Sequence, residues 1–188
     1  DQEYLKIIPR EVLDRDYGCG DPSKYVRKGE TVLDLGSGGG KICFIASQVV
    51  GSSGWVIGVD MNDEMLALAR RANSDVSKRL GYANVEFRKG KIQDLRIDRD
   101  MLDEWLKKNP IKSESDLIAF ESYVKQISET SPMIHDGSID VVISNCVLNL
   151  VNHKDKTMLF QEIYRVLKRG GRAAISDIVS DEPVPLEL

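Results

Sequence analysis

Short runs of apolar residues alternate along the chain with longer segments in which apolar residues recur every three or four positions. The runs predict buried strands, and the periodic segments predict helices with one buried face. Strands are predicted at 31–35, 55–59, 85–87, 139–144 and 172–178. This alternation is typical of an α/β fold in which helices cover both faces of a mainly parallel sheet.

The helices between these strands carry recognisable boundary residues. We expect one helix at 42–50 and a second that begins after Asn62, a good N-cap residue. A third has its apolar residues between Met158 and Leu167, and we expect it to end at Gly170-Gly171. In such folds ligands bind beyond the carboxyl ends of the strands, so the loop after the first strand is the first place to look for a site.

Residues 97–136 lie outside this minimal plan. They contain two apolar stripes, 101–106 and 117–127, separated by Asn109-Pro110 and by a capping pattern of Ser113 with Asp116. We interpret them as a helical hairpin inserted between the third and fourth strands. The hairpin is either a packing addition or a lid or partner surface.

Composition narrows the class of protein. A length of 188 residues favours one domain, 1–188, and a net charge of -4 argues against nucleic-acid and anionic-membrane partners. The three cysteines are odd in number and far apart, and no signal peptide precedes them. These features favour a reducing, cytoplasmic setting. No apolar run reaches the roughly 20 residues of a membrane helix, and no zinc-site motif is present.

The loop after the first strand is rich in glycine, and three ligands compete for it. A phosphate-binding P-loop fails because Leu35 and Ile42 occupy two of its required positions. A nicotinamide dinucleotide loop needs a third glycine where Lys41 stands. Asp34 would also repel a pyrophosphate.

S-adenosylmethionine carries an ammonium and a sulfonium and no phosphate, so it suits the same loop. Asp34 can face the positive charge, and Gly36 and Gly38 let the backbone approach the ligand. Asp60, at the end of the second strand, can accept hydrogen bonds from both ribose hydroxyls, and Met61 can lie against the adenine. The loop thus predicts a methyl-donor site.

Several motifs together resemble the arsenite methyltransferase family of the class I methyltransferases. The glycine loop 32–38 alone would fit many methyltransferases, whereas two cysteine motifs are more specific. The motifs are Tyr17-Gly18-Cys19-Gly20, Gly58-Val59-Asp60-Met61, Ser144-Asn145-Cys146-Val147-Leu148-Asn149-Leu150, Tyr164-Arg165-Val166-Leu167-Lys168-Arg169-Gly170-Gly171 and Ser176-Asp177. The similarity covers most of 12–94 and 137–185.

The resemblance implies a Rossmann-like sheet in the order 3-2-1-4-5, with S-adenosylmethionine as donor and S-adenosylhomocysteine as product. It also implies that thiolates of Cys19 and Cys146 hold arsenic(III), which is methylated on its lone pair. Arsenite or its thiol conjugates would be the substrate, and a cellular thiol the reductant. Ten positions match the family's cofactor contacts: Tyr17, Gly36, Ser37, Gly38, Asp60, Met61, Ile92, Gln93, Asn145 and Val147.

The chain departs from the family in three respects. Glu is usual where Gln93 stands, although the amide can still accept a hydrogen bond. A further family cysteine and the sixth and seventh strands have no counterpart, because the sequence ends at Leu188, and we expect the chain to be a fragment truncated on this side. The insertion 97–136 differs from better-known members. Alternatives therefore remain: methylation of a thiol or a quinone precursor, or a cofactor-binding module without activity.

The remaining candidates for chemistry are few. Cys43 falls on the apolar face of the helix at 42–50, and we interpret it as a core residue. His135 and His153 lie outside every recognised motif and are expected to be exposed loop residues. The shortage of general bases is compatible with a soft acceptor, since an arsenic lone pair or a preformed thiolate needs none.

Overall fold

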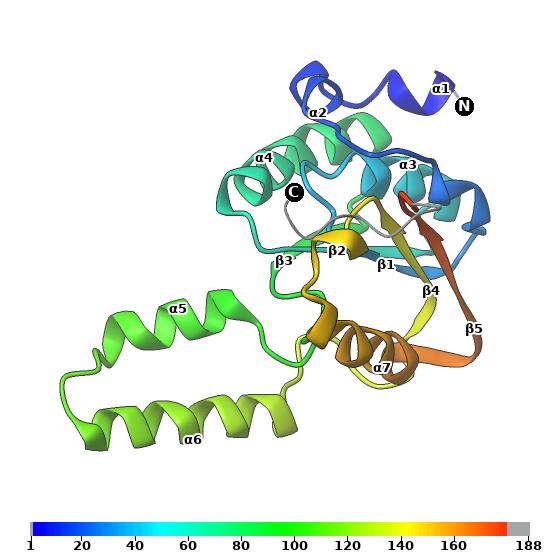
Figure 1. Cartoon of the computed structure of the whole chain (residues 1–188). Helices are drawn as coiled ribbons and strands as arrows, with labels where there is room; N and C mark the ends of the chain where they lie inside the picture. The colour runs from blue at the N-terminus through cyan, green and yellow to red at the C-terminus, as the bar shows by residue number, and fades with distance from the viewer. Residues whose placement is uncertain (1, 180–188) are drawn as a thin grey trace, which may run out of the picture.

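A computed structural model describes residues 2–179 of the chain, and five parallel strands form its central sheet (Figure 1). The strands pair in the order β3-β2-β1-β4-β5, which confirms the predicted order. They are β1 (Thr31–Leu35), β2 (Trp55–Asp60), β3 (Val85–Lys89), β4 (Ile139–Asn145) and β5 (Leu167–Ser176). Strands β2 and β3 are added on one side of β1, and β4 and β5 on the other. The topological switch point therefore lies at the carboxyl ends of β1 and β4.

Helices cover both faces of the sheet, as the alternation of apolar runs and periodic segments predicted. Helices α3 (Lys41–Val50) and α4 (Asp63–Leu80) lie on one face and α7 (Lys156–Val166) on the other (Figure 1). Neighbouring residues of β1 face opposite sides: Val32 joins the core under α3 and α4, and Leu33 joins the core under α7. The sheet is therefore buried on both faces around the switch point.

Short helices complete this body. Helices α1 (Gln2–Leu5) and α2 (Arg10–Asp14) pack on the side of α3 and α4. Three 3-10 turns follow: η1 (Pro22–Tyr25) before β1, then η2 (Leu148–Leu150) and η3 (His153–Asp155) between β4 and α7. Over residues 2–179, the structure contains no helix with the length and apolar character needed to span a membrane.

The start of α4 confirms the predicted N-cap. The Asn62 side chain accepts hydrogen bonds from the backbone N–H groups of Glu64 and Met65, at 3.0 and 3.2 Å. These bonds satisfy two of the donors that a helix leaves unpaired at its first turn. The cap fixes where α4 begins, directly after the strand end that carries Asp60.

The predicted end of the last helix is wrong. Helix α7 ends at Val166 rather than at the glycine pair, and Leu167 already pairs with Ile139 of β4. The register then shifts, so that Arg172 pairs with Val141. Gly170, with φ +83°, therefore lies at an irregular point within β5 and does not end a helix. Pairing with β4 overrides the local helix-stop signal, and β5 ends at Ser176 instead of the expected 178.

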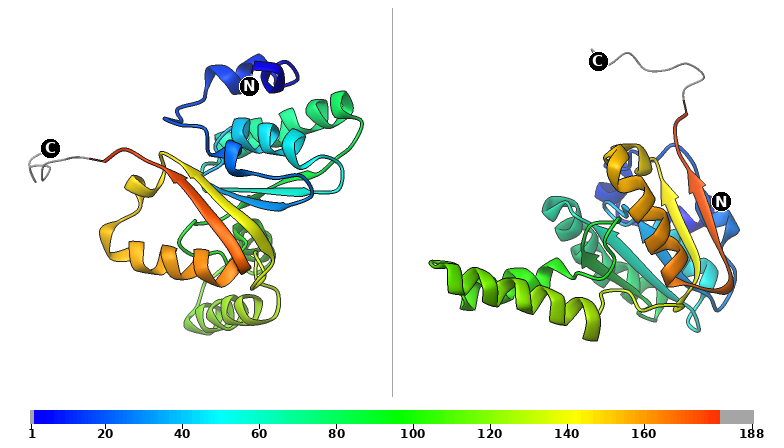
Figure 2. Two further views of the ribbon diagram at one scale, coloured as in Figure 1. Left: turned by 90° about the vertical axis from the view of Figure 1, so that its right-hand side faces the viewer. Right: turned by 60° about the horizontal axis from the view of Figure 1, so that its bottom comes forward.

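The predicted helical hairpin is confirmed. Helices α5 (Arg99–Lys108) and α6 (Glu114–Thr130) project together from the body (Figures 1 and 2). Trp105 of α5 stacks on Tyr123 of α6 with 5.1 Å between ring centroids. No residue of α5 is buried, and Ile127 is the buried residue of α6. Little of the hairpin is therefore buried against the body, to which α5 is joined by ion pairs of Asp100 with Arg70 and of Asp103 with Lys89.

The hairpin should consequently unfold locally without the body. Replacing Trp105 by alanine removes the ring that joins the two helices. We expect amide hydrogen exchange to accelerate throughout 99–130, while the global free energy of unfolding in urea falls by less than about 1 kcal/mol. Leu66→Ala, in the buried face of α4, is the comparison and should cost about 2–5 kcal/mol. Equal losses of global stability in the two variants would show that the hairpin and the body unfold together.

Candidate functional site

A cavity of about 1170 Å³ lies at the carboxyl ends of the central strands. The glycine loop after β1, the end of β2, the loop after β3 and the start of the loop after β4 contribute to its wall, together with the segment 15–18 that precedes the sheet. All positions predicted to bind the cofactor line it: Tyr17, Asp34, Gly36, Ser37, Gly38, Asp60, Met61, Ile92, Gln93, Asn145 and Val147. The fold thus brings together residues spread over 130 positions of the chain.

The glycine loop passes very close to the loop after β4. A Cβ atom added at Gly36 would lie 2.5 Å from both γ-carbons of Val147, and Gly36 has φ +76°. A residue with a side chain is therefore excluded on two grounds, contact and conformation. The amide N–H groups of Gly36 and Ser37 both donate to Val59 O, at 2.8 and 3.1 Å. These bonds hold the loop against β2 and fix the floor of the cavity.

Asp60 is oriented by backbone groups on both of its oxygens. Oδ2 accepts from Gly38 N–H and Oδ1 from Asn62 N–H, each at 2.8 Å. A carboxylate oxygen can accept more than one hydrogen bond, so each retains acceptor capacity toward the cavity. The pair of hydroxyls on a ribose fits this arrangement.

Asp34 is the buried carboxylate of the site, with 2% of its surface exposed. Burial in the protein interior raises its pKa to about 7, although the Cys43 thiol donates a hydrogen bond to Oδ2 at 3.2 Å and opposes that rise. The nearby charges of Asp60 and Asp16 raise the pKa further. Cys43 itself is fully buried, which confirms its assignment to the core. A cation bound in the cavity would stabilise the ionised form of Asp34.

Carboxylates outnumber cations in the lining of the cavity. The acidic residues are Asp16, Asp34, Asp60, Glu64 and Asp155, and the basic ones are Arg15, Lys41 and Lys91. Lys41 pairs with Asp16 and Arg15 pairs with Glu64, each at 2.5 Å. The excess of negative charge fits a cationic ligand and disfavours a pyrophosphate.

Sequence reasoning missed Arg15 and Asp16 as parts of this wall, and it treated Lys41 only as a departure from a dinucleotide motif. Arg15 and Asp16 lie between α2 and the motif that begins at Tyr17, and neither belongs to a recognised motif. Only the packing of the N-terminal segment over α3 and α4 brings them to the cavity.

Three predicted positions differ sharply in exposure. Tyr17 is 83% exposed and Met61 is 55% exposed, whereas Ile92 is buried in the core under α7. The hydroxyl of Ser37 is buried against Gly58 and has no hydrogen-bond partner within residues 2–179. Ser37 therefore turns its side chain toward β2, beneath the loop.

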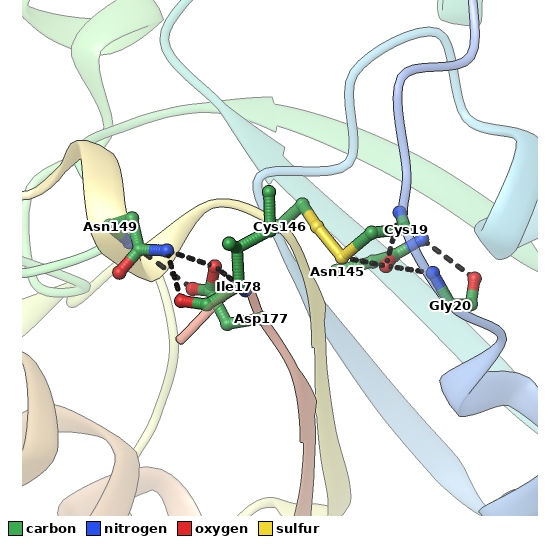
Figure 3. Close-up of a disulfide and its surroundings, with 7 residues drawn as sticks. All are labelled: Cys19, Gly20, Asn145, Cys146, Asn149, Asp177 and Ile178. Atoms are coloured by element: carbon green, nitrogen blue, oxygen red, sulfur yellow. Dashed lines mark hydrogen bonds between the residues drawn. A yellow bond between two sulfur atoms is a disulfide. The ribbon is translucent and has the colours of Figure 1, made fainter. Parts of the chain in front are cut away.

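The two cysteines with predicted roles meet beside the cavity. Cys19 and Cys146 form a disulfide with 5.9 Å between their Cα atoms (Figure 3). The expected juxtaposition is thus present, but the expected pair of thiolates is joined by a covalent bond. Cys19 is exposed and Cys146 is half-buried, and Cys146 also lines the cavity. A reductant can reach the bond from the exposed side.

Neither histidine belongs to the site. His135 and His153 are both exposed, as expected, and neither lines the cavity. Among residues 2–179, no three His, Cys, Asp or Glu side chains cluster as a metal site would require. Neither His135 nor His153 is therefore placed to act as a base in this cavity.

Comparison with known proteins finds methyltransferases. A model described as "Methyltransferase domain" matches residues 26–129 and 100–188. Arsenite methyltransferases of Aquipseudomonas alcaligenes and Halobacterium salinarum are 38% and 40% identical over 98% and 92% of this chain. A crystal structure of an arsenic(III) S-adenosylmethionine methyltransferase from Chlamydomonas reinhardtii superimposes with a TM-score of 0.73, at 32% identity over 99% of this chain.

The chain is shorter than each of these proteins. It spans 43% and 34% of the length of the two relatives and 51% of the crystallised chain. The similarity therefore covers both halves of the sheet and the cavity between them, and leaves the remainder of each relative without a counterpart here.

The raised pKa of Asp34 predicts how stability depends on pH. The folded chain holds this proton more tightly than the unfolded chain does, so the free energy of unfolding falls as pH rises from about 4 to about 7. Asp34→Asn removes this contribution. Relative to the unmodified chain, the variant should gain about 3 kcal/mol between pH 5 and pH 8 in urea unfolding without ligand.

The control is Asp75→Asn on the exposed face of α4, which should show no such gain. A stability difference between Asp34→Asn and the unmodified chain that is the same at pH 5 and pH 8 would contradict the burial argument.

Proposed function

The chain belongs to the methyltransferase-domain family and is closely related to the arsenite methyltransferases, and we propose that it transfers a methyl group from S-adenosylmethionine to arsenic(III). The observation that carries the proposal is the pairing of Cys19 with Cys146 at the rim of the cavity. Two cysteines placed within bonding distance are a chelating dithiol once reduced, and thiolates are the ligands that a soft centre prefers.

The residues of the cavity fit S-adenosylmethionine. The carboxylate of Asp34 would balance the positive charge of the ligand, and Asp60 would accept from the ribose hydroxyls through its remaining lone pairs. Ile92 and Gln93 would contact the adenine, with Met61 against its face. When bound, the cofactor supplies a methyl group activated by its attachment to a sulfonium sulfur.

The cysteine pair must first be reduced. Two thiols of a cellular reductant form a new disulfide between them, and Cys19 and Cys146 each gain a proton. Arsenite then exchanges two hydroxyl groups for the two sulfur atoms and releases two molecules of water. We accordingly propose a reducing compartment such as the cytoplasm, since the disulfide cannot bind arsenic in this way.

Methyl transfer needs orientation more than acid–base help. Arsenic(III) held by the two cysteines would accept the methyl group on its lone pair, and the sulfonium, which would keep the electron pair of the broken carbon–sulfur bond, would become S-adenosylhomocysteine. Cys146 both lines the cavity and holds the acceptor, so it would fix the acceptor near the methyl group. No proton is removed from the acceptor in this step, which agrees with the absence of His135 and His153 from the cavity.

Replacing Cys19 by serine tests the dithiol directly. We expect methylation of arsenite, assayed with excess glutathione, to fall by at least about a hundredfold, because a single thiolate no longer chelates arsenic. Binding of S-adenosylmethionine, measured by calorimetry, should change by less than about threefold, because Cys19 does not line the cavity.

The matched control is His153→Gln, an exposed change outside the cavity that should leave turnover unaltered. Unchanged turnover of arsenite in Cys19→Ser would refute chelation by the dithiol and leave a thiol or a quinone precursor as the acceptor to test. Binding of S-adenosylmethionine without methylation of any of these acceptors would indicate a cofactor-binding module.

A further inference from the structure

The side-chain amide of Asn145 is occupied by the loop that carries Cys19. Its Oδ1 accepts from Cys19 N–H at 3.1 Å and from Gly20 N–H at 2.9 Å, and its Nδ2 donates to Gly20 O at 2.9 Å (Figure 3). Asn145 is the last residue of β4 and precedes Cys146. One side chain thus joins the end of a central strand to a loop more than 120 residues earlier in the sequence.

Apart from the Cys19–Cys146 disulfide, hydrogen bonds to Asn145 are what hold this loop. Within residues 2–179, every hydrogen bond made by residues 17–20 goes to Asn145, and Cys19 and Gly20 are exposed. The glycines permit the close approach: a Cβ atom at Gly18 would collide with Asn145 Nδ2, and one at Gly20 would collide with Ser176 Oγ. The loop therefore lies against the ends of β4 and β5.

The other cysteine is held in an unusual conformation. Cys146 has φ +57°, the one positive φ outside glycine in the described part of the chain. Its N–H donates to Ser176 O at 2.8 Å. Such a backbone costs free energy and persists where the surrounding structure imposes it, often at functional sites. The backbone hydrogen bond to Ser176 thus fixes Cys146, and the hydrogen bonds of Asn145 hold the loop of Cys19 next to it.

We propose that Asn145 is a positioning residue for the dithiol: it sets the effective concentration of the Cys19 thiol at Cys146 and thereby the affinity for arsenic(III). This role rests in part on the proposed function, and it differs from the wall position that the family resemblance implies for Asn145. Two groups that are held together pay less entropy when both bind one centre. The loss of the amide should therefore weaken the pairing of the cysteines even where the cofactor cavity is unaltered.

The disulfide equilibrium measures this effect without arsenic. In a glutathione buffer, two glutathione molecules and the protein disulfide are in equilibrium with glutathione disulfide and the two protein thiols. Asn145→Ala removes the three hydrogen bonds to the loop backbone, so we expect the equilibrium to move about tenfold or more toward the dithiol. Asn145→Asp retains the acceptor oxygen and should show a smaller shift.

Asn149→Ala is the matched control. Asn149 lies on the other side of Cys146, and its side chain donates to Asp177 Oδ1 at 2.6 Å and to Ile178 O at 2.7 Å (Figure 3). It makes no hydrogen bond to the Cys19 loop. This variant should leave the equilibrium within about twofold of the unmodified protein. An equal shift in Asn149→Ala would mean that general loosening of the strand ends, rather than Asn145, moves the equilibrium, and would overturn the proposal.

Two ligand measurements separate the remaining outcomes. The reduced Asn145→Ala protein should bind arsenite about tenfold more weakly, while the Kd for S-adenosylmethionine changes by less than about threefold. An unchanged disulfide equilibrium with a large rise in that Kd would overturn the proposal and make Asn145 a cofactor contact. If the reduced, unmodified protein binds no arsenite but Asn145→Ala still shifts the disulfide equilibrium, the positioning role stands and the proposed function fails. Thermal unfolding of each oxidised variant verifies that it is folded.

Discussion

The parallel pairing of β1 with β4 at the switch point is the contact on which the site depends. It aligns Asp34 with Ile143 and Leu35 with Ser144, so the loops that follow the two strands leave the sheet side by side. Ser144 reinforces the pairing, since its hydroxyl donates to Leu35 O at 3.0 Å. The glycine loop with its cavity and the cysteine of the loop after β4 thereby become neighbours, although more than 100 residues separate them.

The buried carboxylate of Asp34 is energetically unfavourable when the cavity holds no ligand. Asp34 is a carboxylate without a cation partner in the described part of the chain, and its one hydrogen-bonding neighbour there is the weak thiol donor of Cys43. The interior raises the pKa of such a group because it disfavours charge. A cationic ligand would relieve this cost on binding, so the burial of Asp34 would favour ligands with a positive charge.

The two cysteines are brought together by hydrogen bonds between loops and strand ends. The cysteines are supplied by two segments that share no secondary structure, and they meet because Asn145 and Ser176 hold the two loops from opposite sides. Asn145, Cys146 and Val147 line the same cavity as the glycine loop, so the proposed donor and acceptor sites would share this wall. The helices α5 and α6 project from the body beyond the end of β3, and residues 99–130 contribute nothing to the lining of the cavity.

The sequence by itself determined the strands, their order through the family resemblance, the cap at Asn62, the inserted hairpin and every predicted cofactor position that lines the cavity. These features depend on local periodicity and on motifs whose own residues are close together in the sequence. Tertiary structure alone decided the end of α7, the entry of Arg15 and Asp16 into the wall and the bond between Cys19 and Cys146. Each of these depends on contacts between segments distant in the chain, where strand pairing and side-chain hydrogen bonds outweigh the local signal.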